Sequence, residues 1–505
     1  MTSPAADDPG ESTGSLTAPR RDKLARLRAD GIDPFPDDFR RSHTSGEALA
    51  AHEADPDEER TYQLAGRLVR LNDMGKSAFV HIQDAGGRIQ LYFQKNRLGD
   101  ESFDGFIALF DLGDFLGVEG TLFTTRTGEV TLRVIAYRML SKSLRPLPEK
   151  FHGLTDPETR YRQRYLDLIA NEDVRRTFEI RTAVTTTIRH FLDDRGYLEV
   201  ETPILQPVYG GASARPFTTH YNALGEDLYL RIADELYLKR LIIGGMERVY
   251  EFCKDFRNEG IDRTHSPEFT MLEGYEAYAD HRDIMEMVEQ MIAAVATAVH
   301  GGPVMSIDDT EIDFTPPWER ITFREAVRAE TGLDIEDYPD AASLAAETRE
   351  RGLEGNAAMG RGKVLDEILE KLVSPKLHRP TFIHEYPVET SPLAKRSPGD
   401  ERYVGRFEAF AGGMKFANAF TELNDPIDQR ERFAEQARAL ESGDEEAQVL
   451  DEDFLLAMEY GMPPTGGLGV GIDRLVMLMS GQRNIREVIL FPQLRTRTDP
   501  PADSD

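Results

Sequence analysis

The residues best suited to chemistry lie in one stretch, residues 249–278, where arginines, a histidine and carboxylates stand among aromatic side chains. Residues 249–256 are rich in aromatic and β-branched side chains, and residues 269–275 alternate apolar and polar side chains. Both patterns are typical of strands. Because the segment between them contains glycine, aspartate and a Ser-Pro pair, which favour turns, we expect a hairpin.

The charged residues of this hairpin suit a polyphosphate and a cationic group. Arg257 and Glu259 are spaced to share one face of a strand, and His265 lies in the loop. Glu273 and Tyr275 share a face of the return strand. Arginine binds phosphate well, whereas carboxylates pair with cations. On this local pattern alone, an edge hairpin with weak surface ion pairs is an equally good interpretation.

The order of these residues resembles a known family. Phe256-Arg257-Asn258-Glu259, followed by Thr264-His265-Ser266-Pro267-Glu268-Phe269, closely resembles motif 2 of the class II aminoacyl-tRNA synthetases. The next segment, Thr270-Met271-Leu272-Glu273-Gly274-Tyr275, is similar to their lysine-specific subgroup. The similarity runs from about residue 20 to about residue 493.

The resemblance implies ligation of L-lysine to tRNA(Lys) through lysyl-adenylate, with ATP as the other substrate. It implies Arg257 and Arg474 as catalytic residues, with Arg257 on the α-phosphate. The ATP-binding residues that it implies are Arg257, Glu259, His265, Phe269, Glu408 and Arg474, with Phe269 stacked on adenine and Glu259 bonded to its amino group. The lysine-binding residues that it implies are Gly211, Glu235, Glu273, Tyr275, Asn418, Phe420 and Glu422.

Two further segments contain residues that are expected to contact the nucleotide or its metal ion. Residues 466–475 resemble motif 3, a glycine-rich strand that runs into a helix, where glycines form a flat floor for ATP and Arg474 reaches it. Glu408 is placed to bind Mg²⁺, but relatives usually have a second carboxylate seven positions later, where this chain has Lys415. A charged ammonium cannot ligate a metal. Either Lys415 contacts phosphate and replaces the charge of one metal ion, or the metal site is weakened or differently tuned.

Residues 61–145 predict a five-stranded OB-fold β-barrel. Strand patterns at 62–71, 78–83, 88–93, 115–124 and 131–140 enclose a helical pattern at 101–112 after the third strand, which is the order of that fold. The resemblance assigns recognition of the tRNA anticodon to Phe79, Gln90 and Glu129. For any one strand aromatic, a core position is the commoner outcome. Asn72 and Asp73 stand where many relatives have a basic residue.

The whole chain is expected to have an α+β fold, with the barrel followed by a class II catalytic domain whose antiparallel sheet is flanked by helices. The expected segments are a disordered acidic tail (1–18), a helical segment (19–60), the barrel (61–145), a linker (146–172), the catalytic domain (173–495) with a helical insertion at about 322–378, and a loose tail (496–505). Basic residues at 20–28 and 160–164 are candidates to face tRNA, although a solvated helix face is an equally good interpretation of residues 20–28. A helix at 177–195, with Phe178, Val184, Ile188 and Phe191 on one side, resembles motif 1 and implies a homodimer, although such a helix packs equally well within one subunit.

Composition limits the remaining possibilities. No apolar run approaches the roughly 20 residues of a membrane helix, and no secretory signal is present. With one cysteine, Cys253, the chain has no intrachain disulfide, which suits the cytoplasm. The net charge of −30 argues against a general nucleic-acid coat but allows a local basic path. It suggests either adaptation to a salty cytoplasm or an ordinary acidic enzyme.

Three alternative functions stay open. One is a ligase that attaches lysine to a protein, which the complete barrel region disfavours. Another is a class II enzyme for aspartate or asparagine, whose carboxylate substrate requires an arginine where Glu273 stands. The third is a non-catalytic RNA-binding paralogue, which Lys415 favours and the intact set of Arg257, Glu259, Glu408 and Arg474 disfavours.

Overall fold

The structure, a computed structural model, describes residues 13–148, 154–307, 310–353, 355, 360–441 and 449–496. The chain forms two compact units, one of residues 1–155 with 496–505 and one of residues 156–495. The parts of the predicted tails at 1–12 and 497–505, and most of the acidic run at 441–446, lie outside the described residues.

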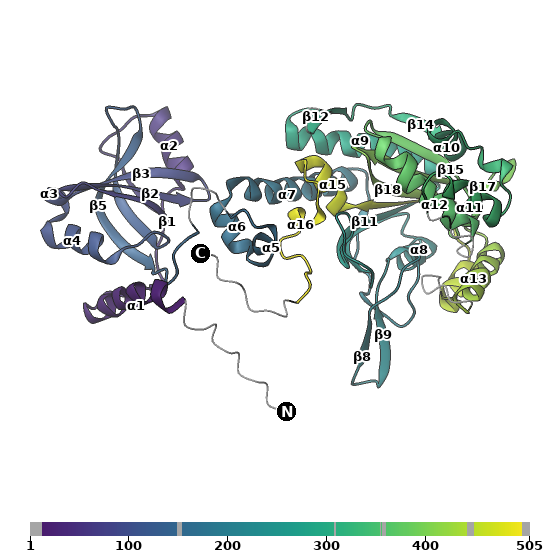
Figure 1. The fold of residues 1–505 in the computed structure, drawn as a ribbon, viewed down its shortest axis with the longest axis horizontal. Coiled ribbons are helices and arrows are strands. Elements are labelled where there is room, and N and C mark those ends of the chain that lie inside the picture. Colours follow the sequence, from purple (N-terminus) through teal and green to yellow (C-terminus); the bar gives the residue numbers. More distant parts are fainter. Residues whose placement is uncertain are drawn as a thin grey trace. The chain divides into compact units, whose positions relative to one another are not determined.

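The N-terminal unit is built on a closed barrel, which confirms the predicted OB-fold (Figure 1). Within the described residues, its strand order is β1-β2-β3-β5-β4. The strands are β1 (Thr61–Asp73), β2 (Ser77–Asp84), β3 (Gly87–Gln94), β4 (Phe115–Thr124) and β5 (Val130–Ser141), and α3 (Lys95–Leu98) and α4 (Asp100–Leu109) follow the third. Alternate strand residues fill the interior, where Leu64, Val80 and Leu91 are fully buried.

Two helices precede the barrel, α1 (Thr13–Ala29) and α2 (Ser45–Ala54). The prediction of a disordered tail up to residue 18 is wrong from Thr13 onward, because α1 continues past Pro19 toward the N-terminus. Arg20 Nη2 donates to the backbone oxygen of Leu112 at 2.9 Å, and Lys23 Nζ lies 2.8 Å from Asp111 Oδ1. These two basic residues therefore hold α1 against the barrel. The sequence pattern had made them candidates for contacts with tRNA.

The second unit is built on a mostly antiparallel sheet, as the class II resemblance implies (Figure 1). Its order is β14-β15-β17-β18-β19-β11-β10-β6, with parallel pairs at the two ends. The strands are β6 (Leu198–Glu199), β10 (Arg248–Phe256), β11 (Glu268–Ala277), β14 (Glu319–Thr322), β15 (Thr381–Pro387), β17 (Asp400–Ala411), β18 (Met414–Thr421) and β19 (Thr465–Gly471), and β16 (Arg396–Ser397) pairs with β17.

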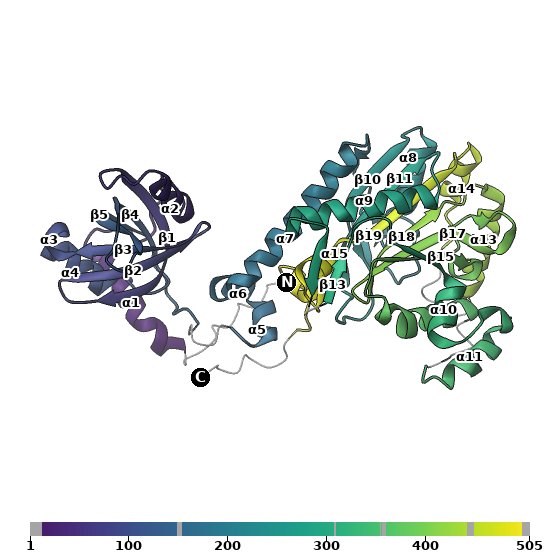
Figure 2. The same cartoon turned by 90° about the horizontal axis from the view of Figure 1, so that it is seen from above.

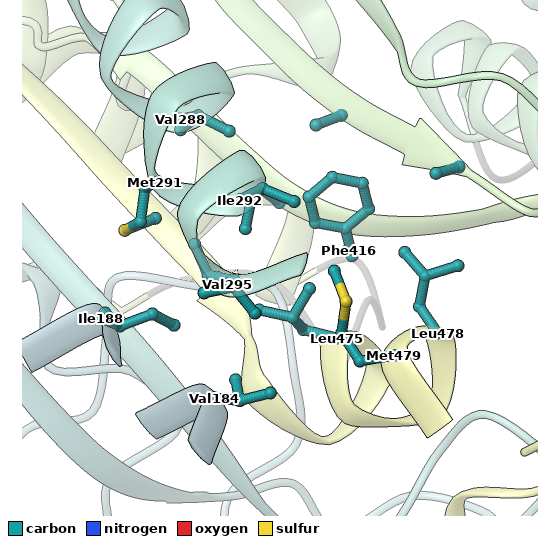
Figure 3. Packing of buried hydrophobic residues seen from close by; sticks show 14 of the residues in the cluster. Val184, Ile188, Val288, Met291, Ile292, Val295, Phe416, Leu475, Leu478 and Met479 are labelled. Carbon is teal, nitrogen blue, oxygen red and sulfur yellow. The ribbon is translucent and has the colours of Figure 1, made fainter. Parts of the chain in front are cut away.

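Three helices cover one face of this sheet: α7 (Glu172–Asp193), α9 (His281–His300) and α15 (Ile472–Ser480) (Figure 2). Alternate sheet residues such as Leu272, Ala417 and Leu468 turn to these helices and join their core. Figure 3 shows side chains of the three helices meeting there: Val184 and Ile188 of α7, Val288, Met291, Ile292 and Val295 of α9, and Leu475, Leu478 and Met479 of α15. The opposite sheet face is left for polar residues.

The helix predicted at residues 177–195 is α7, which begins earlier and ends at Asp193. Val184 and Ile188 are buried as expected, but the buried side also includes Thr177, Ile180 and Leu192. Phe178 and Phe191 are only half-buried, so the predicted apolar side was displaced by about one residue at each end. The prediction chose Phe178 and Phe191 because they are large and aromatic, but the buried positions are their neighbours Thr177 and Leu192.

Short helices α5 (Pro157–Arg162) and α6 (Arg164–Ala170) lie in the predicted linker. Arg164 is completely buried; its Nη1 lies 2.5 Å from Asp167 Oδ2, and its Nη2 donates to the backbone oxygen of Arg486 at 2.7 Å. Arg160 Nη2 lies 2.9 Å from Glu487 Oε2. The expectation that this basic segment faces tRNA is therefore wrong for these two arginines, because they fasten α16 (Ile485–Val488).

The remaining elements surround the sheet. They are β7 (Leu205–Gln206), β8 (Thr218–Tyr221), β9 (Glu226–Leu230), α8 (Glu235–Ile243), β12 (Val304–Ile307), β13 (Thr310–Asp313), α13 (Pro426–Glu441) and α14 (Glu452–Glu459). The predicted insertion contains α10 (Phe323–Thr331), α11 (Ala341–Arg349) and α12 (Arg361–Ile368), which enclose a separate apolar core. None of the described helices is long and apolar enough to cross a bilayer.

Candidate active site

Strand register brings most of the predicted site residues onto the sheet face away from α7, α9 and α15. Glu273 of β11 lies opposite Gly469 of β19, which lies opposite Asn418 of β18, which in turn lies opposite Glu408 of β17. The adjacent row has the order Tyr275, Gly467, Phe420 and Arg406. Segments nearly 200 residues apart in the sequence thus form one polar surface.

The glycines of β19 leave room for carboxylates. A Cβ on Gly469 would lie 2.8 Å from Glu273 Oε1, and a Cβ on Gly467 would lie 2.6 Å from Tyr275 Cε1 and overlap Glu422. A side chain at either position would displace these groups. The two glycines therefore lie beneath these side chains.

A buried ammonium joins two of the predicted carboxylates. Glu235 is the first residue of α8, and Lys239 follows one helical turn later on the same side. Lys239 Nζ lies 2.5 Å from Glu235 Oε1 and 2.5 Å from Glu422 Oε2, and all three side chains are buried. Sequence analysis missed Lys239, although its spacing of four from Glu235 is a detectable signal. Gly211 borders the same pocket, because a Cβ there would lie 3.2 Å from Glu235 Cβ.

The electrostatics of this pocket favour a cation. Burial raises the pKa of Glu422 to about 8, and the charge of Glu235 adds to the shift. Burial and the charges of Asp234 and Glu235 raise the pKa of Glu273 well above its usual range. Tyr275 Oη donates to Glu273 Oε2 at 3.2 Å, and burial raises the pKa of this phenol as well. An added ammonium group would offset the excess of carboxylates.

A second buried acidic group lies next to this pocket. The ligand atoms of Asp234, Cys253 and Asp255 all lie within 4.8 Å of one another, and Arg231 Nε lies 3.4 Å from Asp255 Oδ1. Among the described residues, neither oxygen of Asp234 has a hydrogen-bond partner. Burial raises the pKa of Asp255 to about 6 and raises that of Asp234 well above its usual range. Cys253 is buried, and the sequence pattern gave no sign that the two aspartates lie beside it.

Arg257 stands just beyond β10, with its guanidinium carbon 5.0 Å from the centre of the Phe269 ring. Its Nε is buried and has no hydrogen-bond partner among the described residues, so it is available to an anion. The prediction that Arg257 and Glu259 share a strand face is wrong, because β10 ends at Phe256 and the Glu259 backbone N–H turns back to the Arg257 oxygen at 2.9 Å. Glu259 is exposed in the loop.

His265 and Arg474 are brought together as predicted. Arg474 Nη2 lies 2.9 Å from His265 Nε2, and Arg474 Nε donates to the backbone oxygen of Thr264 at 3.3 Å. Since a guanidinium only donates, His265 Nε2 must accept, and its Nδ1 carries the proton toward Asp262 Oδ2 at 2.8 Å. Although partial burial acts in the opposite direction, the Thr264 backbone N–H and the His265 side chain hold the pKa of Asp262 at about 2.

Glu408, the predicted Mg²⁺ ligand, is already paired with two cations. Its Oε1 accepts hydrogen bonds from Arg406 Nη2 at 2.6 Å and from Lys415 Nζ at 2.9 Å. Although burial acts in the opposite direction, Lys415 and Arg406 lower the pKa of Glu408. Arg406 Nε also donates to Asn418 Oδ1 at 3.0 Å. These residues do not fit a site in which two carboxylates hold a metal ion, because the second position offers an ammonium.

The barrel carries the other predicted set on its outer surface. Phe79 is half-buried outside the barrel core and stacks on Tyr92, with ring centroids 4.7 Å apart. Gln90 Nε2 donates to Glu129 Oε2 at 2.9 Å, and Thr131 Oγ1 donates to Gln90 Oε1 at 2.8 Å. Strands β2, β3 and β5 thus place aromatic and hydrogen-bonding groups side by side, an arrangement suited to unpaired bases.

Two family models match the chain. The model described as tRNA synthetases class II (D, K and N) matches residues 156–495. The model described as OB-fold nucleic acid binding domain matches residues 62–140. The first match covers the sheet with its polar surface, and the second covers the barrel.

Curated relatives are similar over almost their entire length. The lysine–tRNA ligase of Chloroflexus aurantiacus is 53% identical over 485 residues, which cover 96% of this chain and 99% of that protein. Those of Dehalococcoides mccartyi and Roseiflexus castenholzii are 51% and 53% identical, and the alignments cover 96% and 95% of this chain and 98% and 99% of those proteins.

Proposed function

The chain belongs to the lysine–tRNA ligases of the class II tRNA synthetase family, and from this premise we propose how its residues carry out the reaction. The enzyme joins L-lysine to tRNA(Lys) with ATP in two steps. The lysine carboxylate attacks the α-phosphate of ATP, giving lysyl-adenylate and diphosphate. A terminal ribose hydroxyl of the tRNA then takes the lysyl group, and AMP leaves.

We propose that the buried carboxylates bind the ammonium groups of lysine. The observation that carries this assignment is that three carboxylates, those of Glu235, Glu273 and Glu422, converge on one pocket. Among the described residues, the ammonium that contacts two of them is that of Lys239. Tyr275 and Asn418 supply hydrogen bonds, and Phe420 and Gly211 shape the walls. A site that pairs a buried carboxylate with an ammonium rejects apolar side chains strongly, because the carboxylate would otherwise stay unpaired.

We propose that the arginines bind ATP and the transition state. Arg257, with its unpartnered Nε, holds the α-phosphate on which negative charge develops. Arg474 and His265 hold the remaining phosphates, and Phe269 stacks on adenine. Glu259 bonds the adenine amino group from the loop after β10. Catalysis in this scheme is positioning and charge neutralisation, without a protein nucleophile.

The family is ATP-dependent and generally requires Mg²⁺. Glu408 stays the predicted ligand for such an ion, but its two cationic partners and the lysine at position 415 do not fit a pair of metal-binding carboxylates. The proposed steps therefore rely on the side chains alone.

Exchange between diphosphate and ATP, measured with each amino acid in turn, tests the assignment. We expect lysine to support exchange at a rate far above that of any other amino acid. Exchange dependent on aspartate or asparagine, or no exchange with any amino acid, would overturn the proposal.

Lysine binding should release protons at neutral pH. In the free enzyme Glu422 has a raised pKa, about 8, because it is buried, so the carboxyl is mostly protonated at pH 7. A bound ammonium favours the ionised form, so a proton leaves. The apparent affinity for lysine should therefore rise from pH 7 to pH 9, below the ordinary pKa of the lysine side chain at about 10.4.

Titration calorimetry in two buffers of different ionisation enthalpy measures this release. We expect proton release at pH 7, in which Glu422 contributes up to about one proton, and this contribution should decline toward zero near pH 9. Proton uptake, or a proton count that stays constant with pH, would contradict the protonated Glu422.

We propose that the barrel surface reads the tRNA anticodon through Phe79, Gln90 and Glu129. Replacing Phe79 with alanine removes a stacking surface and should raise KM for tRNA(Lys) in aminoacylation by about tenfold or more, with lysine-dependent exchange unchanged. Phe115→Ala is the matched control, because Phe115 is a 37% exposed barrel aromatic that packs beneath Arg67. An equal effect of both substitutions on KM for tRNA would exclude a specific role for Phe79.

We further propose that the enzyme is a homodimer that acts in the cytoplasm. The segment after α7 exposes apolar side chains at Leu198, Ile204 and Leu205, as a subunit interface near motif 1 would require. Participation in translation and a single cysteine support the cytoplasmic location.

A further inference from the structure

Glu408 contacts two cationic side chains, and they differ in how firmly they are held. The side chain of Arg406 is 11% exposed and contacts Glu408, Asn418 and Ser391, so it is fixed in place. The side chain of Lys415 is 42% exposed, and its Nζ lies 2.9 Å from Glu408 Oε1. Arg406 keeps its contact with Glu408, so the ammonium of Lys415 can leave Glu408 without leaving that carboxylate unpaired.

A β-bulge turns Lys415 toward the site. Ala409 of β17 lies opposite Ala417, but the next residue, Phe410, lies opposite Lys415, so Phe416 is the extra residue. Phe416 and Ala417 both point into the core beneath α9 and α15. Strict alternation would put Lys415 on that core face; the bulge moves it to the face of Glu408 instead.

The backbone of Lys415 is also joined to the phosphate-binding arginine. Arg474 Nη1 donates to the Lys415 backbone oxygen at 3.3 Å, while Arg474 Nη2 contacts His265. Lys415, Arg474 and His265 therefore form one continuous group at the polyphosphate side of the site. A half-exposed ammonium beside these groups is suited to a phosphate oxygen.

We propose that Lys415 is a phosphate-binding residue of the adenylation step and supplies positive charge that a metal ion held between two carboxylates would otherwise supply. This inference rests on the proposed function. When ATP binds, Lys415 Nζ exchanges Glu408 Oε1 for a phosphate oxygen, and Arg406 keeps its contact with Glu408. The protein itself then holds no metal ion between positions 408 and 415.

Binding of a non-hydrolysable ATP analogue tests this role apart from activity. In EDTA the wild-type enzyme should bind the analogue, and Lys415→Met should weaken binding by about 10- to 100-fold, the effect of one charge-assisted hydrogen bond. Lys376→Met is the matched control, because Lys376 is 55% exposed and lies 2.7 Å from Glu330. Equal affinity of wild type and Lys415→Met in EDTA would overturn the inference.

Counting metal ions gives a second readout. With saturating lysine and the ATP analogue, Mn²⁺ titration followed by electron paramagnetic resonance should show one more bound ion in Lys415→Glu than in wild type, because the substitution creates a carboxylate pair with Glu408. Exchange catalysed by Lys415→Glu should require a higher Mg²⁺ concentration. An equal ion count and an unchanged Mg²⁺ curve would contradict the inference. Failure of wild type to show lysine-dependent exchange would instead reject the proposed function itself.

Discussion

Replacing Arg257 with alanine should lower kcat/KM for lysine-dependent ATP–diphosphate exchange by about 10²- to 10³-fold, the effect of removing one preorganised donor from a developing charge. Arg257 is held over Phe269 at 5.0 Å, and its Nε has no hydrogen-bond partner among the described residues. The guanidinium is therefore in position before the substrates arrive. Most of the loss should fall on kcat, because charge on the α-phosphate grows in the transition state.

Arg248→Ala is the control for this substitution. Arg248 stands at the other end of β10, is half-exposed, and forms an ion pair with Glu276 at 2.7 Å, so its loss should leave the exchange rate near that of wild type. Arg257→Lys should recover only part of the rate, because an ammonium cannot reproduce the planar set of donors. A rate for Arg257→Ala within about twofold of wild type would remove Arg257 from the mechanism.

Replacing Glu422 with glutamine should raise KM for lysine by about 10²-fold or more. Glu422 is buried, its Oε2 lies 2.5 Å from Lys239 Nζ, and its Oε1 has no hydrogen-bond partner among the described residues. Glutamine keeps the shape but cannot ionise when lysine binds, so in the complex Glu235 alone must balance Lys239 and less negative charge is left for the substrate. Removing one partner of a buried ionic contact is costly because the other stays unpaired.

The matched control is Glu452→Gln, which removes an exposed carboxylate 2.9 Å from Arg430 and should leave KM for lysine unchanged. The steady-state KM values for lysine and ATP, measured in the exchange assay, separate the two substrates. The KM for ATP should move little in Glu422→Gln. A comparable rise in both KM values would indicate general damage to the fold and would contradict a specific role in lysine binding.

The strands that carry the site were predictable because each has a local signal. The alternation at 269–275 and the glycine-rich segment at 466–471 mark β11 and β19, and the residues named from the resemblance lie on their polar face. The barrel was predictable for the same reason, since its strands alternate and its turns contain glycine. Local periodicity therefore gave most of the fold.

What the sequence did not reveal depends on contacts between distant segments. Lys239 joins Glu422, which is 183 residues away, and only its spacing from Glu235 hinted at a role. Arg164 was expected at the surface, yet it is buried against the backbone of a segment more than 320 residues later. The bulge at Phe416 reverses the face on which Lys415 lies, and no residue type at these positions predicts a bulge. Such features follow from tertiary packing, which local propensity does not encode.

The central claim is that the arginines of the site bind the nucleotide and that its glutamates bind the ammonium groups of lysine. A crystal structure of the enzyme with L-lysine and a non-hydrolysable ATP analogue tests it most directly. The claim predicts the side-chain nitrogen of lysine within about 3.2 Å of carboxylate oxygens of Glu273 or Glu422, and the α-phosphate at a similar distance from Arg257. A lysine side chain bound away from Glu235, Glu273 and Glu422 would contradict it.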